Sequence, residues 1–340
     1  MSDARKRVGA RTAVALVAAA QVFIGIATAR GSGHPGEIGP VGSLIRTNYH
    51  GWTNSLVLSN GRVEAVIVPA VGRVMQFRFA GEEEGPFWEN RAMDGLMPQS
   101  ESKEWGNFGG DKSWPAPQAD WNRVTPRAWP PPVAFDAMPV EAKVDGLVVT
   151  LVSAVDPDYG IRTVRQIRLD LDRPVMTIET TYQKVSGIPL RAAVWVITQL
   201  KDPELACVQL PKFERFREGY NSQSDELPAH LKIVDGLLSL TRDPKASHKV
   251  GTDSGILFWV GRDSVLAIVS ARQIFGDYPD EGCSAEIYTN PDPLKYVELE
   301  MLGPLQKMIE GDRISRSSTY TLLRRTEVDP ELEVRKLLSH

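Results

Sequence analysis

The sequence of 340 residues predicts an all-β protein, built as a large antiparallel sandwich or barrel with one short helix at its C-terminus. Eleven short segments are rich in β-branched and aromatic residues, and most show alternation or short apolar runs. Turn signals such as SNGR, VDGL, KVSG and EGDR separate many of them, as expected for antiparallel meanders. No helical pattern lies between the segments, which argues against a parallel α/β sheet.

The predicted strands follow one another at short spacing from residue 63 to residue 323. They cover residues 63–68, 73–79, 147–153, 162–169, 175–182, 191–198, 256–260, 265–270, 285–289, 295–302 and 318–323. The one predicted helix, DPELEVRKLL at 329–338, begins with an Asp cap and has Pro in its first turn. No internal repeat or composition break divides the chain, so we expect one β domain over residues 44–340.

The N-terminus has the pattern of an export signal. Four bases within residues 1–11 precede the apolar run AVALVAAAQVFIGIATA, and Ala27-Thr28-Ala29 is a small-residue cleavage site. We therefore expect a signal peptide at 1–29, a Gly- and Pro-rich tether at 30–43, and a periplasmic or secreted protein. One alternative is an uncleaved anchor helix, since the run approaches the roughly 20 residues that span a bilayer. The other alternative is a cytoplasmic protein.

The charge balance makes nucleic acid an improbable partner. The formal net charge is −4, and removal of residues 1–29 takes away four bases and one acid, leaving −7 over 311 residues. Binding to phosphates needs a basic surface. The two cysteines, Cys207 and Cys283, fit one disulfide or two buried thiols equally well. Neither their spacing nor the histidines suggest a metal site, and no cofactor motif is present.

Residues 85–139 interrupt the series of strands with a long segment rich in Pro, Gly and Trp. Five of the eight Trp residues lie here, at positions 88, 105, 114, 121 and 129. Long irregular loops are usually functional or disordered, and disordered segments are poor in aromatic residues. The segment is therefore predicted to be an ordered functional loop, although its Trp residues would also suit a small secondary core.

Indole rings suit stacking on the C–H face of a sugar, while neighbouring amides and charges bind its hydroxyls. From this segment we expect ligand binding by Trp105, Asn107, Trp114, Gln118 and Trp121. Arg165, Arg191 and Gln199 on middle strands could also bind hydroxyls, or could be ordinary outward-facing strand residues.

The segment KYVELEML at 295–302 carries two candidate catalytic carboxylates. Alternation places Tyr296, Glu298 and Glu300 on one face of a strand, opposite Val297, Leu299 and Met301. On an ordinary sandwich this face is solvated. If the Trp-rich loop covers it, burial would raise the pKa of a Glu toward values useful for a general base.

Several of these stretches together resemble a known family. WGNFGGDKSWPAPQADW, WPPPVAFD, SNGRVEAVIVPAVGRVMQF and YVELEMLGPLQKMIEGD are similar to the DUF4380 family, and through it to the galactose mutarotase-like, aldose 1-epimerase superfamily. The resemblance extends from about residue 50 to about residue 323 and implies an antiparallel β-supersandwich that binds a saccharide on a concave sheet.

In mutarotases of that superfamily, a Glu on a late strand removes the proton of the anomeric hydroxyl and a His protonates the ring oxygen. The resemblance implies Glu298 or Glu300 as the base. The sequence departs from the pattern where the mutarotases carry their two His residues, since Phe108 and Trp195 stand near those positions. Trp195 then joins the expected sugar-binding residues, and Lys112 or Asp111 is the candidate replacement for the His acid.

The sequence therefore predicts an exported carbohydrate-binding protein of mutarotase-like fold, with the catalytic candidates Glu298, Glu300, Lys112 and Asp111. One form of the prediction is an aldose-epimerase-like isomerase. The alternatives are a non-catalytic carbohydrate-binding module and an accessory part of a polysaccharide lyase or hydrolase system. The sequence leaves the sugar and the oligomeric state undetermined.

Overall fold

The computed structural model describes residues 42–99, 104–212 and 215–339. The predicted signal peptide at 1–29 lies outside these residues, as does the predicted tether except for its last two positions. The first strand, β1, already begins at Ser43.

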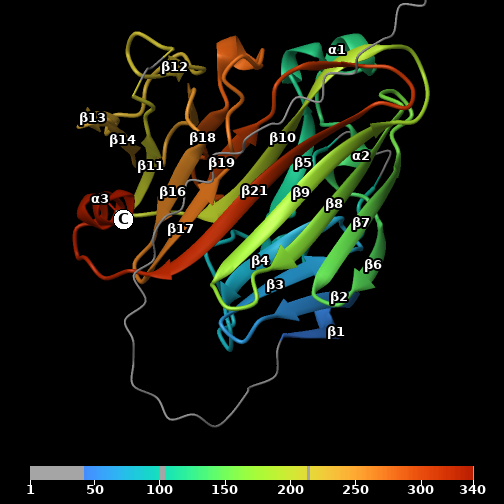
Figure 1. The fold of residues 1–340 in the computed structure, drawn as a ribbon, viewed down its shortest axis with the longest axis horizontal. Coiled ribbons are helices and arrows are strands. Elements are labelled where there is room, and N and C mark those ends of the chain that lie inside the picture. The colour runs from blue at the N-terminus through green and yellow to red at the C-terminus, as the bar shows by residue number, and fades with distance from the viewer. Residues whose placement is uncertain (1–41, 100–103, 213–214, 340) are drawn as a thin grey trace, which may run out of the picture.

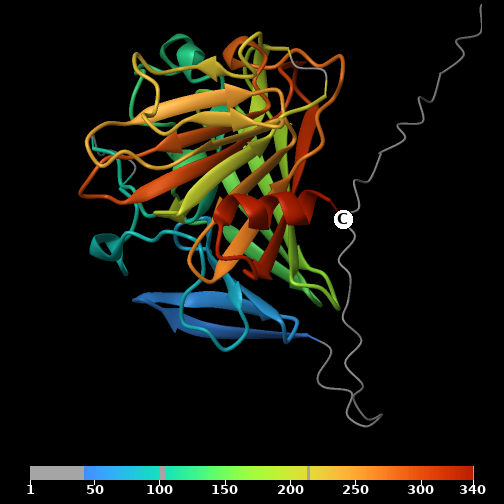
Figure 2. The ribbon, with the colours of Figure 1, turned by 90° about the vertical axis from the view of Figure 1, so that its left-hand side faces the viewer.

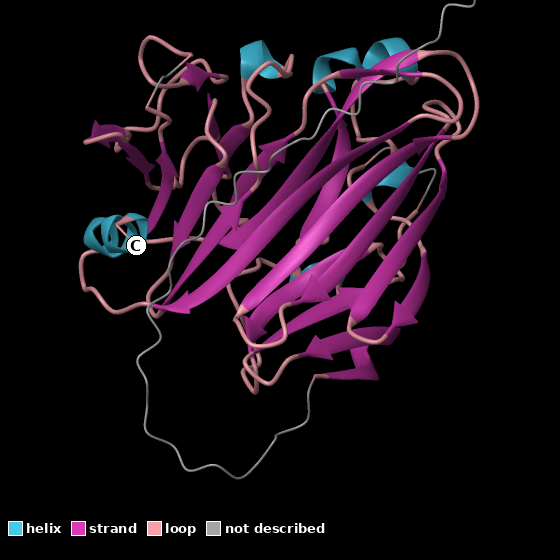
Figure 3. Cartoon of the chain, viewed as in Figure 1, coloured by secondary structure: helices cyan, strands magenta, loops and turns pink. Residues whose placement is uncertain are grey.

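Two antiparallel sheets pack face to face and form the body of the described molecule (Figures 1 and 3). Within the described ranges, the first sheet has eleven strands. In spatial order these are β1 (Ser43–Tyr49), β2 (Trp52–Ser59), β3 (Val63–Val68), β4 (Arg73–Phe79), β5 (Asp111–Ala116), β10 (Leu190–Lys201), β19 (Tyr296–Leu302), β18 (Ala285–Thr289), β15 (His248–Thr252) and β12 (Asn221–Ser222), with β20 (Gln306–Met308) also paired to β10.

The second sheet has ten strands among the described residues and forms the front layer of Figure 1. Its order is β13 (Lys232–Val234), β14 (Leu237–Leu240), β11 (Leu205–Gln209), β16 (Ile256–Val260), β17 (Ser264–Val269), β21 (Arg313–Arg324), β9 (Val175–Lys184), β8 (Ile161–Leu169), β7 (Val148–Val155) and β6 (Glu141–Asp145). The all-β prediction is therefore confirmed, and the architecture is a sandwich.

All eleven predicted strands are present. β3, β4, β16 and β18 have the predicted bounds, and the other seven differ by a few residues at their ends. The predicted C-terminal helix is α3 (Pro330–Leu338), and the Asp329 carboxylate caps it by accepting from the N–H groups of Glu331 and Leu332. Figure 2 shows α3 lying along one side of the sandwich, where it contacts β11 and β16.

The segment 85–139 is less irregular than its composition predicts, because β5 lies within it and joins the centre of the first sheet. β5 pairs with β10 along its whole length, from Asp111 opposite Thr198 to Ala116 opposite Ala193. Its pairing with β4 is limited to Val74 opposite Asp111. Pro115 has no N–H to donate. It is tolerated because the pairing of β5 with β4 does not extend to this residue. The short helices α1 (Trp121–Val124) and α2 (Val133–Asp136) follow β5.

The two sheets share one main hydrophobic core, formed by the facing sides of strands such as β3, β9, β10 and β19. A smaller core beneath α3 contains Cys207, which is a free thiol, as is Cys283. The two cysteines are therefore buried thiols and do not form a disulfide. Within the described ranges, no helix is both long enough and apolar enough to cross a bilayer.

Candidate functional site

Charged and aromatic side chains gather on the face of the first sheet that points away from the second sheet. Strand register places them together, because Trp195 on β10 is opposite Trp114 on β5, while Ile197 is opposite both Lys112 on β5 and Glu300 on β19. Residues directly opposite one another share a face. β5 and β19 are buried along their whole lengths, so this outer face is covered by other parts of the chain.

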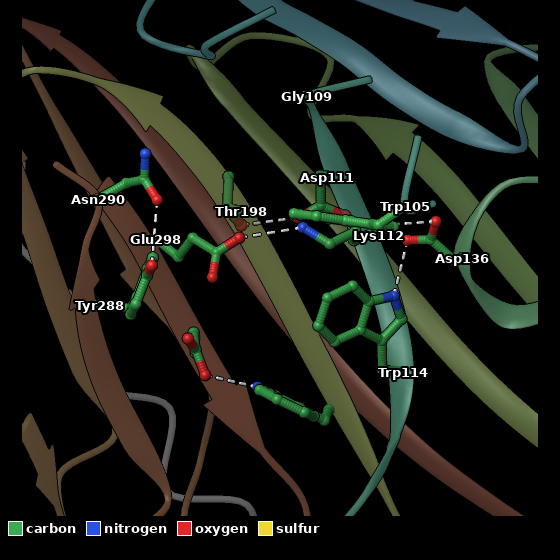
Figure 4. Close-up of polar contacts among 12 residues, drawn as sticks. Trp105, Gly109, Asp111, Lys112, Trp114, Asp136, Thr198, Tyr288, Asn290 and Glu298 are labelled. Atoms are coloured by element: carbon green, nitrogen blue, oxygen red, sulfur yellow. Dashed lines mark hydrogen bonds and ion pairs between the residues drawn. The ribbon is translucent and has the colours of Figure 1, made fainter. Parts of the chain in front are cut away.

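An ion pair between Lys112 and Glu298 lies at the centre of this face (Figure 4). The ammonium Nζ is 3.2 Å from Glu298 Oε1, and the two side chains reach each other across β10. Lys112 Nζ also lies 4.8 Å from the ring centre of Trp114 and 5.6 Å from that of Trp105, within the range of cation–π attraction. Burial lowers the pKa of Lys112, and the charge of Glu298 partly opposes this.

The two indoles are held by Asp136, at the end of α2. Trp114 Nε1 donates to Asp136 Oδ1 at 2.8 Å and Trp105 Nε1 donates to Oδ2 at 3.0 Å (Figure 4). The fully buried Arg73 pairs with the same carboxylate at 2.8 Å. Burial lowers the pKa of Arg73, and the charge of Asp136 opposes this. The orientation of both rings beside Lys112 is therefore fixed by a buried ion pair.

Gly109 lies just before β5, where the chain passes close to the backbone of Trp88. Its φ is +91°, and a Cβ at this position would lie 2.4 Å from the backbone oxygen of Trp88. Arg73 donates to the Gly109 backbone oxygen at 2.7 Å. A glycine is thus required for the close approach of two backbone segments at the rim of the site.

A second charged group lies beside the first and is centred on Lys249, from β15. Its Nζ is 2.7 Å from Glu286 Oε2, 2.9 Å from Glu300 Oε2 and 4.5 Å from the ring centre of Trp195. Trp195 Nε1 also donates to Glu300 Oε2 at 2.7 Å. Burial raises the pKa of Glu300 well above its ordinary value, against the effect of Lys249. Burial tends to lower the pKa of Lys249, but the two carboxylates outweigh it and the pKa is raised.

Asp111 and Arg165 were both expected at the site, but Asp111 lies on the opposite face of the first sheet and meets Arg165 between the two sheets. The Arg165 guanidinium, from β8 of the second sheet, pairs with the Asp111 carboxylate. Asp111 Oδ2 also accepts from the hydroxyls of Thr198 at 2.7 Å and Tyr320 at 2.6 Å. This group joins the two sheets, and alternation along β5 points Asp111 away from Lys112.

The remaining predicted residues divide into two sets. Asn107 and Gln199 are buried close to Glu298, and Tyr296 lies beside them. By contrast, Gln118 is exposed, and Trp121 packs in the core with its Nε1 bonded to the backbone oxygen of Pro115 at 2.7 Å.

Two other groups considered for hydroxyl or proton chemistry also lie apart from Glu298. Arg191 forms an exposed ion pair with Asp277. His50 lies near Asp94, His230 is exposed, and His248 contacts Glu226 and Asp243.

Several residues of the site were not identified from the sequence. Arg73 follows a glycine at the start of a strand. Glu286 lies between Ala285 and Ile287, and Lys249 lies between His248 and Val250, so each has the pattern of an ordinary strand residue. Asp136 ends a short helix and the string WPPPVAFD, but nothing in that string indicates that its carboxylate would hold two indoles. The strand order, which brings β4, β5, β10, β19, β18 and β15 side by side, and the contact of α2 with β5 place them together.

No family model matches the sequence, and no curated protein matches it. Solved structures do resemble the fold. A proposed aldose 1-epimerase from Klebsiella pneumoniae has a TM-score of 0.57 at 10% identity, covering 87% of this chain and 85% of its own. A proposed aldose 1-epimerase from Escherichia coli K12 has a TM-score of 0.55 at 12% identity, covering 79% and 98%.

A galactose mutarotase-like protein from Lactobacillus casei has a TM-score of 0.52 at 8% identity, covering 79% of this chain and all of its own. These likenesses extend over most of each molecule. The chain therefore has the galactose mutarotase-like β-sandwich fold that its sequence predicts.

Proposed function

We propose that this protein binds a saccharide on the covered face of the first sheet and interconverts its anomers, as an aldose-epimerase-like isomerase. The observation that carries the proposal is the ion pair of Lys112 with Glu298, set against the rings of Trp105 and Trp114. Anomerisation needs a base and an acid close to one sugar carbon, and aromatic faces hold the apolar side of the ring. The fold shared with aldose 1-epimerases supports the same proposal.

Glu298 is the better candidate for the base than Glu300. Its side chain is 9% exposed and only its Oε1 is bonded to Lys112, whereas the Glu300 side chain is 1% exposed and its Oε2 accepts from both Trp195 and Lys249. A base must reach the proton that it removes. Glu300 is instead a positioning residue for Trp195.

The proposed reaction moves two protons. Glu298 takes the proton of the anomeric hydroxyl while the bond from C1 to the ring oxygen breaks, and the ring oxygen takes a proton from the Lys112 ammonium. The open chain then has a free aldehyde, which rotates and closes with the other configuration as the proton transfers reverse. Because Lys112 and Glu298 are hydrogen-bonded, a proton can also pass between them to restore the starting charges.

The test is anomer exchange followed by NMR or polarimetry over a panel of neutral aldoses, with Glu298→Gln and Glu300→Gln beside the wild type. We expect Glu298→Gln to lower exchange by about 10²–10⁴-fold, the usual contribution of one proton-transfer group, while the sugar still binds. Glu300→Gln should retain exchange within a few fold. Loss of exchange only in Glu300→Gln would reverse the assignment, and absence of both binding and exchange in the wild type would refute the sugar proposal.

The role of Lys112 is tested by its pH profile. Since burial lowers its pKa, exchange in the wild type should decline with rising pH before the ordinary lysine range is reached. Lys112→Met should be slow and should lack this alkaline decline. An unchanged pH profile in Lys112→Met would remove Lys112 from the acid role.

Among the described residues no histidine lies at this site, which favours a second candidate function, a non-catalytic carbohydrate-binding module. Phe108 and Trp195 stand near the positions at which mutarotases carry His, and the described histidines lie elsewhere. In this alternative, Trp fluorescence would report sugar binding, with no catalysed exchange by the wild type.

Export to the periplasm or medium is part of the proposal and rests on the basic and apolar pattern of residues 1–29. N-terminal sequencing of the protein recovered from the periplasm or medium should give a chain that starts at Arg30. Membership of the DUF4380 family is likewise proposed, on the four strings that resemble it, of which the Trp-rich one is the most specific. Recovery of the full-length chain from the cytoplasm would contradict export but not the function.

A further inference from the structure

Residues 280–282, between β17 and β18, form a strained turn. Asp280 and Glu281 have φ angles of +50° and +62°, in the left-handed region that is uncommon for residues other than glycine, and Gly282 follows at +109°. Such a backbone conformation persists only where the surrounding contacts hold it. Loss of one of these contacts would therefore allow the turn to relax and move.

The contact that holds Asp280 is a hydrogen bond between two carboxyl groups. Its partner is Glu286 on β18, which is fully buried and also accepts from Gln223 Nε2 at 2.6 Å. Two carboxylates have only acceptors, so they share a hydrogen bond only while one of them carries a proton. Burial and the charge of Glu286 raise the pKa of Asp280 from 3.8 to about 6, so this proton is held in mild acid.

The nearest cation does not replace the shared proton. Lys249 Nζ, from β15, lies 2.7 Å from Glu286 Oε2 and 2.9 Å from Glu300 Oε2. Its single positive charge is therefore already shared between two carboxyl groups before Asp280 ionises. Lys249 acts to lower the pKa of Asp280, but burial and Glu286 outweigh it.

Two arginines also face the turn, and both contact its backbone. Arg215 Nε donates to the backbone oxygen of Glu281 at 3.0 Å, and Arg272 Nη1 donates to that of Gly282 at 3.0 Å. The charges that shift the pKa of Asp280 are those of Glu286 and Lys249. The arginines therefore support the shape of the turn, while the shared proton holds the Asp280 side chain against β18.

We propose that residues 279–284 form a pH-sensitive flap, which a proton shared by Asp280 and Glu286 holds closed in mild acid and which ionisation of Asp280 releases. Once the proton is lost, the two carboxylates repel each other, and movement of the turn away from β18 lets its backbone return to ordinary φ angles. The inference goes beyond the proposed function and does not depend on it, because the flap lies apart from the pair of Lys112 with Glu298.

Cys283, directly after the turn, reports whether the flap is closed. Its side chain is fully buried, and its Sγ accepts from Gln223 Nε2 at 3.6 Å. A Cβ on Gly251 of β15 would lie only 2.4 Å from this sulfur, so the thiol packs closely against that strand. The other free thiol, Cys207, lies in the core beneath α3. Displacement of residues 279–284 would therefore expose Cys283 and leave Cys207 buried.

The experiment labels the full chain with N-ethylmaleimide between about pH 5 and about pH 8, and peptide mass spectrometry measures the labelling rate of each cysteine. The rate at Cys283 divided by the rate at Cys207 corrects for the pH dependence of thiol reactivity. We expect this ratio to rise about tenfold in the wild type and to become level above about pH 6, where Asp280 is ionised in both the closed and the open flap.

The variant Asp280→Asn keeps a hydrogen-bonding side chain that tolerates the left-handed region but has no charge to lose. Its ratio should stay low across the whole pH range. The matched control is Asp277→Asn, which removes an exposed carboxylate of the same loop, paired with Arg191, and should keep the wild-type rise. A flat ratio in the wild type would overturn the flap. An equal rise in Asp280→Asn would also overturn it, because another group would then be responsible.

Amide hydrogen exchange of residues 279–284 in the wild type gives a second measurement that needs no variant. After correction for the intrinsic pH dependence of exchange, we expect protection of these amides to fall about tenfold between about pH 5 and about pH 7. Constant protection would contradict the proposal. None of these measurements involves a sugar, so failure of the flap and failure of the proposed function are distinguished.

Discussion

The outer faces of the two sheets differ in how far they are exposed to solvent. In β8, β9 and β21 of the second sheet, buried residues alternate with exposed or half-buried ones, as in an ordinary sheet with one solvated face. In β5 and β19 of the first sheet every residue is buried, and β10 is buried except at its ends. The outer face of the first sheet is therefore covered, although it carries Lys112, Glu298 and Glu300.

Burying such groups is costly unless they are paired, and the protein pairs them in two ion clusters. A solvated sheet face would carry the same residues at little cost. The contrast indicates that the first sheet buries polar residues on its outer face, whereas the second sheet mainly completes the hydrophobic core. Substitutions that remove one partner from a buried ion pair test this comparison.

The largest effect is expected where the sheets meet. Arg165→Met leaves the fully buried Asp111 carboxylate without its cation and should lower the free energy of unfolding by about 3–5 kcal/mol. Denaturant unfolding measures this. The matched control is Arg168→Met on the exposed face of the same strand, which should change stability by less than about 0.5 kcal/mol. Equal effects of the two substitutions would mean that the inner pair contributes no more than a surface charge.

Lys249→Met should have the next largest effect, because it leaves Glu286 and Glu300 facing each other without a cation. We expect a loss of roughly 2–3 kcal/mol near pH 8. The loss should shrink toward pH 5, since Glu300 already has a raised pKa and protonation removes the repulsion. Unfolding midpoints of variant and wild type across this pH range check the prediction. A loss independent of pH would indicate that packing of the lysine stem, and not its charge, is responsible.

A smaller, pH-dependent effect on stability is expected at Asp280. Burial, together with the nearby Glu286, raises the pKa of Asp280 from 3.8 to about 6. The native protein therefore holds this proton more tightly than the unfolded chain, and the resulting stabilisation is lost as the pH rises from about 4 through about 6.

Asp280→Asn should remove that dependence, so the stability difference between wild type and variant should fall over this range and become level above it. Urea unfolding at intervals of pH measures the difference. A constant difference would show that Asp280 titrates alike in the folded and unfolded chains.

The smallest effect is expected at α3, which covers part of the second sheet. Asp329→Ala removes the cap from two backbone N–H groups and should cost about 1 kcal/mol. Asp329→Asn keeps an acceptor and should cost only about a few tenths of a kcal/mol. Thermal unfolding of both variants provides the measurement, and equal losses would assign the effect to charge instead of capping.

Much of the fold could be predicted because its central strands carry strong local patterns. VEAVIV and AEIYT contain β-branched residues between turn signals, and their bounds were found as predicted. β5 was missed because DKSWPA has a charged start and a proline, and only its one-sided pairing with β10 makes it a strand. Short strands such as β12 and β20 depend similarly on partners distant in the sequence.

The candidate site could be predicted in part. The alternation of KYVELEML placed Glu298 and Glu300 on one face, and the Trp-rich string identified Trp105, Trp114 and Lys112 as neighbours in sequence. Asp111 was grouped with Lys112 because the two are adjacent in sequence, although strand alternation sends their side chains to opposite faces.

The sequence by itself determined the fold class, the positions of eleven strands and the residue types available for chemistry, because these depend on local periodicity and turn composition. The tertiary structure decided which of those residues meet. Lys112 and Glu298 are 186 positions apart, and only the order β5, β10, β19 joins them. Likewise, burial of the outer face depends on which segments cover it, a property of packing that no local pattern contains.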